Sequence, residues 1–435
     1  MKNFKDSGIE WLGEIPQHWE VVTLKYLVEK IIGGGTPDTS NLDYWTNNKK
    51  DGYLWVSIED ITKSSFITDT KRYITQNGLK SSSAKLIPPF SILYSIYASL
   101  GKIAYSDQIL TTNQAILGIQ SNHKLVFYKF LFYYLCNTTN YVTILSSMTT
   151  QNNISLSVVA NLKIPLPPLK EQEQIANFLD EKCEQIKNFI EKKEKLINLL
   201  KEQKQALINE TITKGLDKNV NFKDSGIKYL GEIPQHWKVK RLANFGAFLK
   251  GNGISRQDLA EDGESAILYG DIYTKYQIKT HFLHSKISKK TSLSATPIYN
   301  GDILFSGSGE TKEDIGKSVV YLGDDNAFAG GDVIIFRQKE NNALFLSYVL
   351  NTKYANFCKS IDSKGEIIVH IYASNLKDIK IPLPPLKEQE QIANFLDEKC
   401  EKIDLLIEKT EKQIKLIKEY KTTLINQAVC GRINL

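Results

Sequence analysis

Two stretches of this 435-residue chain occur twice, about 217 residues apart, while the sequences between them do not repeat. The first pair, Phe4–Leu24 and Phe222–Leu242, is identical at 16 of 21 positions. The second pair, Ile164–Ile186 and Ile381–Ile403, differs at a single position. The order constant, variable, constant therefore occurs twice, which predicts one scaffold that carries two different domains.

Composition narrows the class of protein. With 42% hydrophobic and 24% charged residues, the chain is globular and long enough for two to three domains. Its longest apolar-rich stretch, Leu125–Leu135, is too short to span a bilayer and contains Lys129, so we expect a cytoplasmic protein with no membrane contact. The five cysteines form no C-x-x-C pair, which predicts reduced thiols and no metal site. The net charge of +6 is compatible with nucleic-acid binding without demonstrating it.

Each copy of the second repeat leads into a long charged segment without glycine or proline. The sequence IPLPPL precedes it, and Gly215 or Gly431 follows it, as expected for a helix start and a left-handed C-cap. The expected inward positions, most of them apolar, advance mainly by alternating threes and fours, which is a heptad seam. We expect the two helices to pack on each other; the alternative is that each lies on its own domain.

The first seam is Ile175, Leu179, Cys183, Ile186, Ile190, Lys193, Ile197, Leu200, Lys204 and Leu207. The second is Ile392, Leu396, Cys400, Ile403, Ile407, Thr410, Ile414, Ile417, Lys421 and Leu424.

The variable blocks, Tyr26–Asn161 and Asn244–Leu376, show short β-type runs between Gly-, Ser- and Asn-rich turns. Ile92-Leu93-Tyr94-Ser95 in the first block matches Ile303-Leu304-Phe305-Ser306 in the second, and a Gly-Lys pair follows each. This pattern is typical of one α+β fold with different loops, because loops tolerate change better than strands.

A search for a catalytic set finds only weak matches. Phe305-Ser306-Gly307-Ser308-Gly309 resembles a glycine-rich cofactor loop, but no (N/D)-P-P-(F/Y/W) segment accompanies it, as an adenine methyltransferase would require. His18 and His236 lie in the repeated QHW without ligand partners at metal spacing, which favours a structural role. We therefore expect a chain without catalytic residues of its own.

The duplicated IPLPPLKEQEQIA and GEIPQHW segments closely resemble those of the specificity (S, or HsdS) subunit of type I restriction-modification systems. The stretches GGGTP, TTNQA and YGDIYT fit the same family. The resemblance implies an α+β protein in which two mixed α/β target recognition domains are joined by two long antiparallel conserved helices, a coiled coil, with a pseudo-twofold internal repeat. The domain boundaries are then 1–163, 164–215, 216–380 and 381–435.

The resemblance also implies the partners. They are double-stranded DNA with an asymmetric bipartite site, two modification subunits that carry S-adenosylmethionine and methylate adenine at N6, and restriction subunits that use ATP and Mg. The chain itself would bind no cofactor and would be nucleoid-associated when on DNA. The alternatives are a self-sufficient methyltransferase or nuclease with degenerate motifs and a purely structural helical scaffold.

Loops with forked or cationic side chains are the candidates for DNA contact, because Arg, Lys, Asn and Gln read base edges and Ser, Thr and Lys bind phosphate. In the first block these are Thr36, Lys49, Lys50, Ser99, Lys102, Asn113 and Gln114. In the second they are Arg256, Gln257, Thr274, Lys275, Tyr276, Ser308, Lys312 and Lys317. For docking of a partner on the helices we select Phe178, Phe189, Phe395 and Leu405, which alternatively complete the core of the chain itself.

Overall fold

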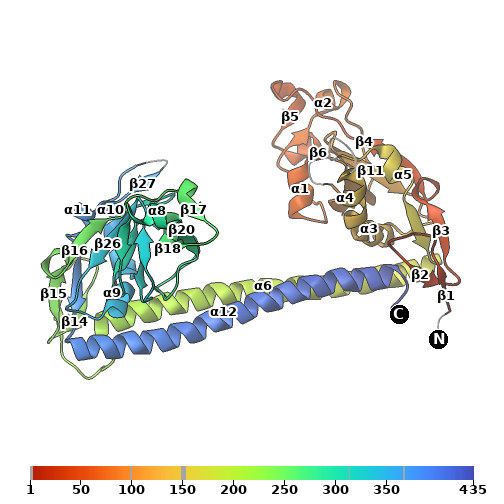
Figure 1. Cartoon of the computed structure of the whole chain (residues 1–435). Helices are drawn as coiled ribbons and strands as arrows, with labels where there is room; N and C mark the ends of the chain where they lie inside the picture. The colour runs from red at the N-terminus through yellow and green to blue at the C-terminus, as the bar shows by residue number, and fades with distance from the viewer. Residues whose placement is uncertain (1–2, 98–99, 148–152, 313, 366–367) are drawn as a thin grey trace. The chain divides into compact units, whose positions relative to one another are not determined.

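The computed structural model describes the chain except residues 1–2, 98–99, 148–152, 313 and 366–367 (Figure 1). It consists of two compact units. Unit 1 comprises Met1–Lys193 and Lys412–Leu435, and unit 2 comprises Glu194–Glu411. Helices α6 (Leu169–Lys214) and α12 (Leu386–Val429) continue from one unit into the other. No helix among the described residues is long and apolar enough to cross a membrane.

The first variable domain, Tyr26–Asn161, contains two four-stranded sheets (Figure 1). One is antiparallel in the order β4 (Val28–Gly33), β11 (Ile116–Ser121), β8 (Ser91–Ser95) and β9 (Ile103–Ser106). The other has the order β10 (Leu110–Thr112), β6 (Tyr53–Val56), β7 (Tyr73–Ile74) and β5 (Trp45–Thr46). The helices are α1 (Ile58–Lys63), α2 (Gln76–Lys80), α3 (Tyr128–Asn137), α4 (Thr139–Ser147) and α5 (Leu156–Ala160).

The second variable domain, Asn244–Leu376, has two five-stranded sheets and a short ladder. The first has the order β16 (Ala247–Lys250), β26 (Val333–Arg337), β22 (Ile303–Ser306), β24 (Ser318–Tyr321) and β19 (Lys279–Thr280). The second has the order β17 (Leu259–Ala260), β20 (Ser285–Ile287), β18 (Glu264–Ile267), β25 (Ala327–Ala329) and β21 (Thr296–Ile298). The ladder pairs β23 (Ser308–Gly309) with β27 (Val369–His370). The helices are α7 (Tyr269–Thr274), α8 (Lys289–Ser292), α9 (Ala343–Leu350), α10 (Lys353–Ile361) and α11 (Ala373–Leu376).

The repeated segments form the same structure in each unit, which we call the constant frame. It includes two hairpins, β1 (Phe4–Asp6) with β2 (Glu14–Pro16) and β13 (Phe222–Asp224) with β14 (Glu232–Pro234). It also includes two antiparallel ladders, β3 (Glu20–Thr23) with β12 (Lys163–Leu166) and β15 (Lys238–Arg241) with β28 (Lys380–Leu383). Each ladder brings the first and last residues of one variable domain together.

The helix prediction is confirmed. α6 and α12 begin directly after the paired prolines, and Gly215 and Gly431 follow their ends with φ of 73° and 69°, in the left-handed region that favours glycine. All twenty seam positions are buried or half-buried. Within each unit the two helix segments lie side by side and antiparallel (Figure 1): Ile175 and Leu179 of α6 share a core cluster with Leu424 of α12 in unit 1.

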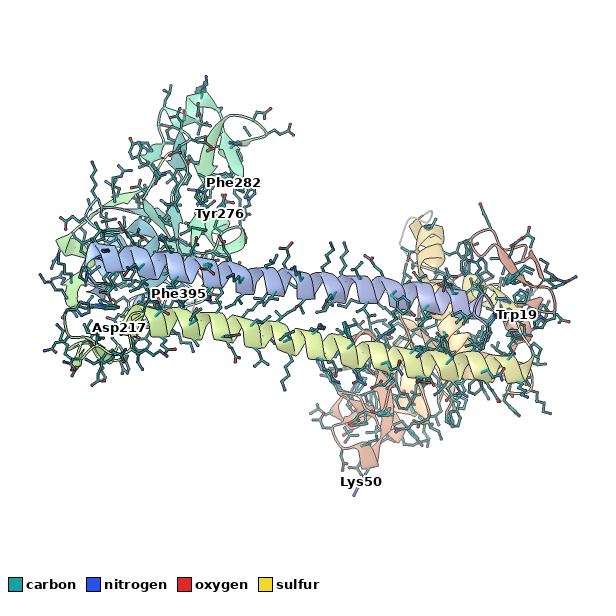
Figure 2. The ribbon with its side chains drawn as sticks, turned by 90° about the horizontal axis from the view of Figure 1, so that it is seen from below. Trp19, Lys50, Asp217, Tyr276, Phe282 and Phe395 are labelled. Carbon is teal, nitrogen blue, oxygen red and sulfur yellow. The ribbon has the colours of Figure 1, made fainter. Side chains whose placement is uncertain are left out.

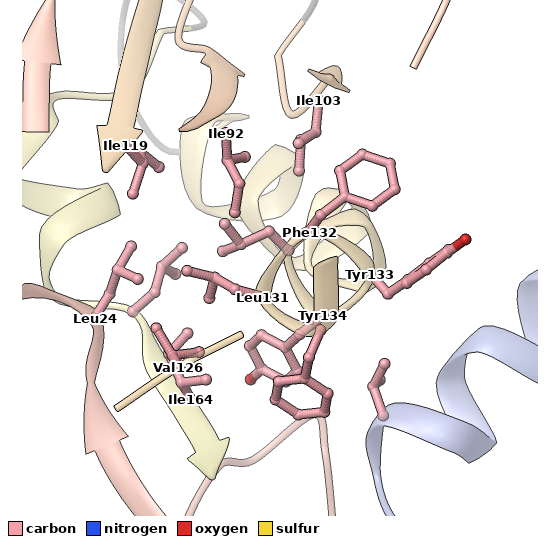
Figure 3. Packing of buried hydrophobic residues seen from close by; sticks show 14 of the residues in the cluster. Leu24, Ile92, Ile103, Ile119, Val126, Leu131, Phe132, Tyr133, Tyr134 and Ile164 are labelled. Carbon is pink, nitrogen blue, oxygen red and sulfur yellow. The ribbon is translucent and has the colours of Figure 1, made fainter. Parts of the chain in front are cut away.

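That core cluster joins the frame to the first variable domain (Figure 3). α3 contributes Leu131 and Tyr134, the sheet contributes Ile92, and the frame contributes Leu24 and Ile164. The apolar-rich stretch Leu125–Leu135 contributes most of α3, which begins at Tyr128 because Phe127 is extended and takes the N-cap position. A matching cluster in unit 2 joins α9 to both long helices. The variable domains are thus anchored by their cores to the frame.

A lysine is buried in the second variable domain. Lys359 of α10 has no exposed surface, and its Nζ donates to the carbonyl oxygens of Gly316 and Leu350, each at 2.8 Å. Burial disfavours the ammonium form and lowers the pKa of Lys359 to about 7. This group therefore links folding stability to pH.

We expect this lysine to make the chain more stable as pH rises from about 7 to 10.5, because over that interval the unfolded chain holds a proton on Lys359 that the folded chain has released. Below about pH 7 both states are protonated and the cost of burying the charge is fully present. Urea unfolding at pH 7 and pH 9 should show a smaller rise in unfolding free energy for Lys359→Met than for the wild type. Lys353→Met, at an exposed position of the same helix, should keep the wild-type rise; equal slopes in all three proteins would refute the assignment.

Candidate nucleic-acid interface

The loops that the sequence singles out in the second variable domain surround one concavity. A cavity of 990 Å³ is lined by Arg256, by Thr274 and Lys275 at the end of α7, by the turn Gly309–Thr311, and by Asp332 before β26. These segments come from four separate parts of the sequence. The structure therefore brings Arg256, Thr274 and Lys275 together on a polar surface that also carries the carboxylates of Asp271, Glu310, Asp314 and Asp332.

α7 is held firmly at the wall of this cavity. Its first turn contains Asp271, whose Oδ2 accepts from the backbone N–H of Leu268 at 3.0 Å and from the Ser285 hydroxyl at 2.9 Å. The other carboxylate oxygen of Asp271 forms an ion pair with Lys275 at 2.8 Å, one turn later. The buried carboxylate thus fixes the direction of the lysine side chain, which remains 40% exposed.

Three of the residues predicted to contact DNA in this domain are buried or half-buried and form hydrogen bonds within the domain or lie beneath one of its ladders. Tyr276 is 5% exposed, and its hydroxyl accepts from the backbone N–H of His284 at 2.9 Å. Ser308 is 2% exposed because the β23–β27 ladder covers it. Lys317 is half-buried and donates to the carbonyl oxygen of Tyr273 at 3.1 Å, and burial lowers its pKa. Tyr276 and Ser308 are therefore corrected from surface residues to buried ones.

Other predicted residues of the second domain are on the surface. Gln257 follows Arg256 in an exposed 3₁₀ turn, Arg256–Asp258, and Lys312 is exposed in the loop after the cavity rim. Neither Gln257 nor Lys312 is among the described residues that line the cavity. Both stay predictions for DNA contact.

In the first variable domain the structure joins two of the predicted loops. Thr36 donates from its hydroxyl to Oε1 of Gln114 at 2.5 Å, and the backbone N–H of Gly35 donates to the carbonyl oxygen of Thr112 at 2.8 Å. The Oδ1 of Asn113 accepts from the N–H of Ala115, so that this amide shapes the turn. Gln114 is exposed beside it, with its Oε1 held by the Thr36 hydroxyl.

The remaining predicted residues of the first domain lie on other loops. Lys49 and Lys50 are exposed in the 3₁₀ turn Lys49–Asp51, and Nζ of Lys49 donates to the carbonyl oxygen of Thr68 at 2.8 Å. Figure 2 shows Lys50 at an outer edge of its domain. Lys102 is exposed after Gly101, and Ser99 lies outside the described residues.

The repeated histidines belong to the frame. His18 Nε2 lies 2.9 Å from Oε2 of Glu171, and the indole N–H of Trp19 donates to the same oxygen at 3.2 Å. The copy in unit 2 repeats both contacts, with His236 at 2.8 Å and Trp237 at 3.0 Å from Glu388. The predicted structural role of these histidines is consistent with this geometry. The sequence analysis did not single out the first glutamate of KEQEQ, which is Glu171 in one copy and Glu388 in the other. That KEQEQ and QHW are both duplicated was the available signal.

The next residue of that motif anchors the variable domains. Gln172 is fully buried; its Oε1 accepts from the backbone N–H of Phe127 at 2.7 Å, directly before α3. Gln389 does the same in unit 2 with the N–H of Asn342, directly before α9. The frame therefore recognises backbone groups of the variable domains, which do not depend on the variable sequence.

The four predicted docking residues divide into two pairs. Phe178 and Phe395, at equivalent repeat positions, are half-buried against the core of their own unit, as the alternative interpretation expected. Figure 2 shows Phe395 on α12. Phe189 and Leu405 are 38% and 48% exposed, so that these two present apolar surface. Among the described residues, no three His, Cys, Asp or Glu side chains are placed to hold a metal ion.

Comparison with known proteins gives the family. The family model of the type I restriction modification DNA specificity domain matches residues 16–210 and 234–416, and the chain belongs to this family. Over its whole length the chain is 27% identical to a putative type I restriction enzyme specificity subunit, MjaX, of Methanocaldococcus jannaschii, 97% of which is covered. It is also 27% identical to the EcoR124I/EcoR124II specificity subunit of Escherichia coli, over 41% of this chain and 42% of that protein.

Solved structures show the same fold. A chain from a study of complex assembly and conformational transition of the type I R-M system matches 96% of this chain and 99% of its own length, with a TM-score of 0.73 at 18% identity. The HsdS subunit from Thermoanaerobacter tengcongensis matches with a TM-score of 0.53, also at 18% identity, over 96% of this chain and 98% of its own. The predicted fold, two mixed domains joined to two long antiparallel helices, is confirmed.

Proposed function

We propose that this chain is the DNA sequence-specificity subunit of a type I restriction-modification complex and recognises an asymmetric bipartite site. The observation that carries this proposal is the duplicated frame holding two domains with different loops, in a chain that belongs to the specificity family. In the second domain, loops distant in sequence surround one cavity with Arg256 and Lys275. Because the loops of the two domains differ, the two half-sites differ as well.

The frame supports the second part of the proposal, the positioning of two modification subunits. The constant segments recur in both units with the same contacts, so that each copy offers one partner the same surface. Exposed Phe189 and Leu405, which lie on the helices just beyond the repeated segments, add apolar area for docking. α6 and α12 have 46 and 44 residues without a break. Helices of this length connect two DNA-binding domains more stiffly than a flexible linker would.

In this division of labour the chain is non-catalytic and binds no cofactor. S-adenosylmethionine belongs to the modification subunits that methylate adenine at N6, and ATP with Mg belongs to restriction subunits where these are present. The chain contributes affinity for DNA through cationic loops, which makes binding of the assembled complex fall steeply with salt.

Sequencing of methyl-adenine in cells that carry this chain with its modification subunit tests the proposal. We expect a motif of two different half-sites separated by a fixed number of unspecified bases, and its loss when the chain is deleted. A single continuous methylation motif, or a motif that persists without the chain, would contradict the proposal. Methyl transfer by the purified chain alone would favour a self-sufficient enzyme instead.

A further inference from the structure

The two variable domains share one turn at the same place in their folds. Before β11 the N–H of Asn113 donates to the carbonyl oxygen of Val56 at 3.0 Å. Before β26 the N–H of Gly330 donates to the carbonyl oxygen of Ile267 at 2.9 Å. The strand register agrees as well, since Ile116 pairs with Ser95 and Val333 pairs with Ser306. Asn113–Ala115 and Gly330–Asp332 are therefore equivalent turns.

A glycine approaches each turn in the same way. A Cβ on Gly34 would lie 2.0 Å from the carbonyl oxygen of Asn113, and a Cβ on Gly251 would lie 2.0 Å from that of Gly330. The backbone of this turn is thus the same in the two domains, while its side chains differ. The first domain presents the amide of Gln114, and the second presents only glycines and the carboxylate of Asp332.

Asp332 is held in a fixed position. Its φ is +60°, a left-handed conformation that Asp tolerates better than most residues, and its carbonyl oxygen accepts from the N–H of Gly307 at 2.7 Å. Its Oδ2 accepts from the buried hydroxyl of Ser308 at 3.1 Å, and that hydroxyl lies 2.9 Å from Nδ1 of His370. The strained backbone and the side-chain bond together fix the direction of the carboxylate.

The side chain is exposed and lines the cavity that also contains Arg256 and Lys275. The lining also includes the carboxylates of Asp271, Glu310 and Asp314. A carboxylate repels phosphate, so Asp332 favours a hydrogen-bond donor as its partner. A carboxylate only accepts hydrogen bonds, and in the major groove the exocyclic amino groups of cytosine and adenine are the donors. Adenine carries the acceptor N7 beside its amino group, which repels the second carboxylate oxygen; cytosine carries none.

We propose that Asp332 is a specificity-determining residue of the second variable domain and accepts a hydrogen bond from N4 of a cytosine in the half-site read by this domain. This inference rests on the proposed function. In the equivalent turn of the first domain the amide of Gln114 stands where the second domain has Gly331, one position before Asp332, so the same turn presents different groups to the two half-sites. Ser308 is a positioning residue that acts through Asp332.

The test uses the full chain in complex with its modification subunit and a library of DNA duplexes randomised in the half-sites. The wild-type complex should select cytosine at one position of the half-site read by residues 216–380. In Asp332→Asn, preference for cytosine over the other bases should fall roughly 10-fold or more at this position alone, with adenine gaining most, because an amide pairs with adenine N6 and N7. The other half-site should stay unchanged.

Asp325→Asn is the matched control, since it makes the same chemical change in an exposed residue before β25, away from the turn that follows this strand. It should leave the selected sequences unchanged. Asn also tolerates a positive φ, so Asp332→Asn should keep the wild-type melting temperature. An unchanged motif in folded Asp332→Asn, or the absence of cytosine from that half-site, would overturn the inference while leaving the proposed function intact. Failure of the wild-type complex to select any sequence would instead defeat the proposed function.

Discussion

Trp237→Ala is expected to lower the free energy of unfolding by about 3–5 kcal/mol, the usual cost of removing a buried aromatic side chain. Trp237 has no exposed surface. Its indole N–H donates to Glu388 in the first turn of α12, and its ring lies against Gly215 at the end of α6, where a Cβ would meet the ring at 3.2 Å. One side chain therefore connects the start of one long helix to the end of the other.

The loss has two physical components. The substitution removes a large apolar contact and leaves a cavity, and it also leaves the half-buried carboxylate of Glu388 with one donor fewer. Trp19→Ala should behave similarly, because Trp19 makes the equivalent contacts with Glu171 and Gly431 in unit 1. Figure 2 shows Trp19 beside the ends of the two helices.

Denaturant unfolding of the full chain measures the effect. Leu293→Ala is the control, because this side chain is 88% exposed and its loss should change stability by no more than about 0.5 kcal/mol. A loss below about 1 kcal/mol in Trp237→Ala would show that the tryptophan is not what joins the helices. It would also remove the structural reason for the repeated QHW.

The sequence allowed the frame to be predicted because it occurs twice. Duplication marks GEIPQHW and KEQEQ as parts of one structure, and proline before the helices with glycine after them gives the helix bounds. The pairing of His18 with Glu171 was not predictable from one sequence. The two residues are 153 positions apart, and no local pattern relates a histidine on a turn to a glutamate on a helix.

The site was predicted less completely, for a reason visible at two positions. Ser308 looks like an exposed residue of a glycine-rich loop, yet it is buried because β23 pairs with β27, a strand some sixty residues later. Asp332 looks like an ordinary turn residue, and its fixed carboxylate depends on the register of β22 against β26 and on that same serine. Long-range strand pairing decides both the burial of Ser308 and the orientation of Asp332, and the pattern of polar residues along the chain does not predict that pairing.

Replacing the first variable domain, Tyr26–Asn161, by the corresponding block of another family member is expected to change one half-site completely and to leave the other half-site and the spacer intact. The reason lies in how the block meets the frame. It enters and leaves beside the β3–β12 ladder, where the N–H of Leu24 donates to the carbonyl oxygen of Leu162 at 2.8 Å, and Gln172 holds the backbone before α3.

The second unit shows that this frame accepts a different block. There the N–H of Leu242 donates to the carbonyl oxygen of Ile379 at 3.0 Å, and Gln389 holds the backbone before α9. Asp180 and its repeat Asp397 each bind a lysine of their variable domain, Lys129 on α3 in one case and Lys279 on β19 in the other. The frame thus fixes backbone groups and one cation, and leaves the loops free to differ.

Methyl-adenine sequencing of cells carrying the exchanged chain measures the outcome. Specific sites typically bind roughly 10³-fold or more tightly than unrelated DNA, so the old half-site should disappear from the motif rather than weaken. An exchanged block that lacks a lysine able to reach Asp180 serves as the control, and should assemble less stably without altering which bases the other half reads. Loss of both specificities after exchange of a single block would mean that the frame transmits changes between the domains, and the modular interpretation of the repeats would then be wrong.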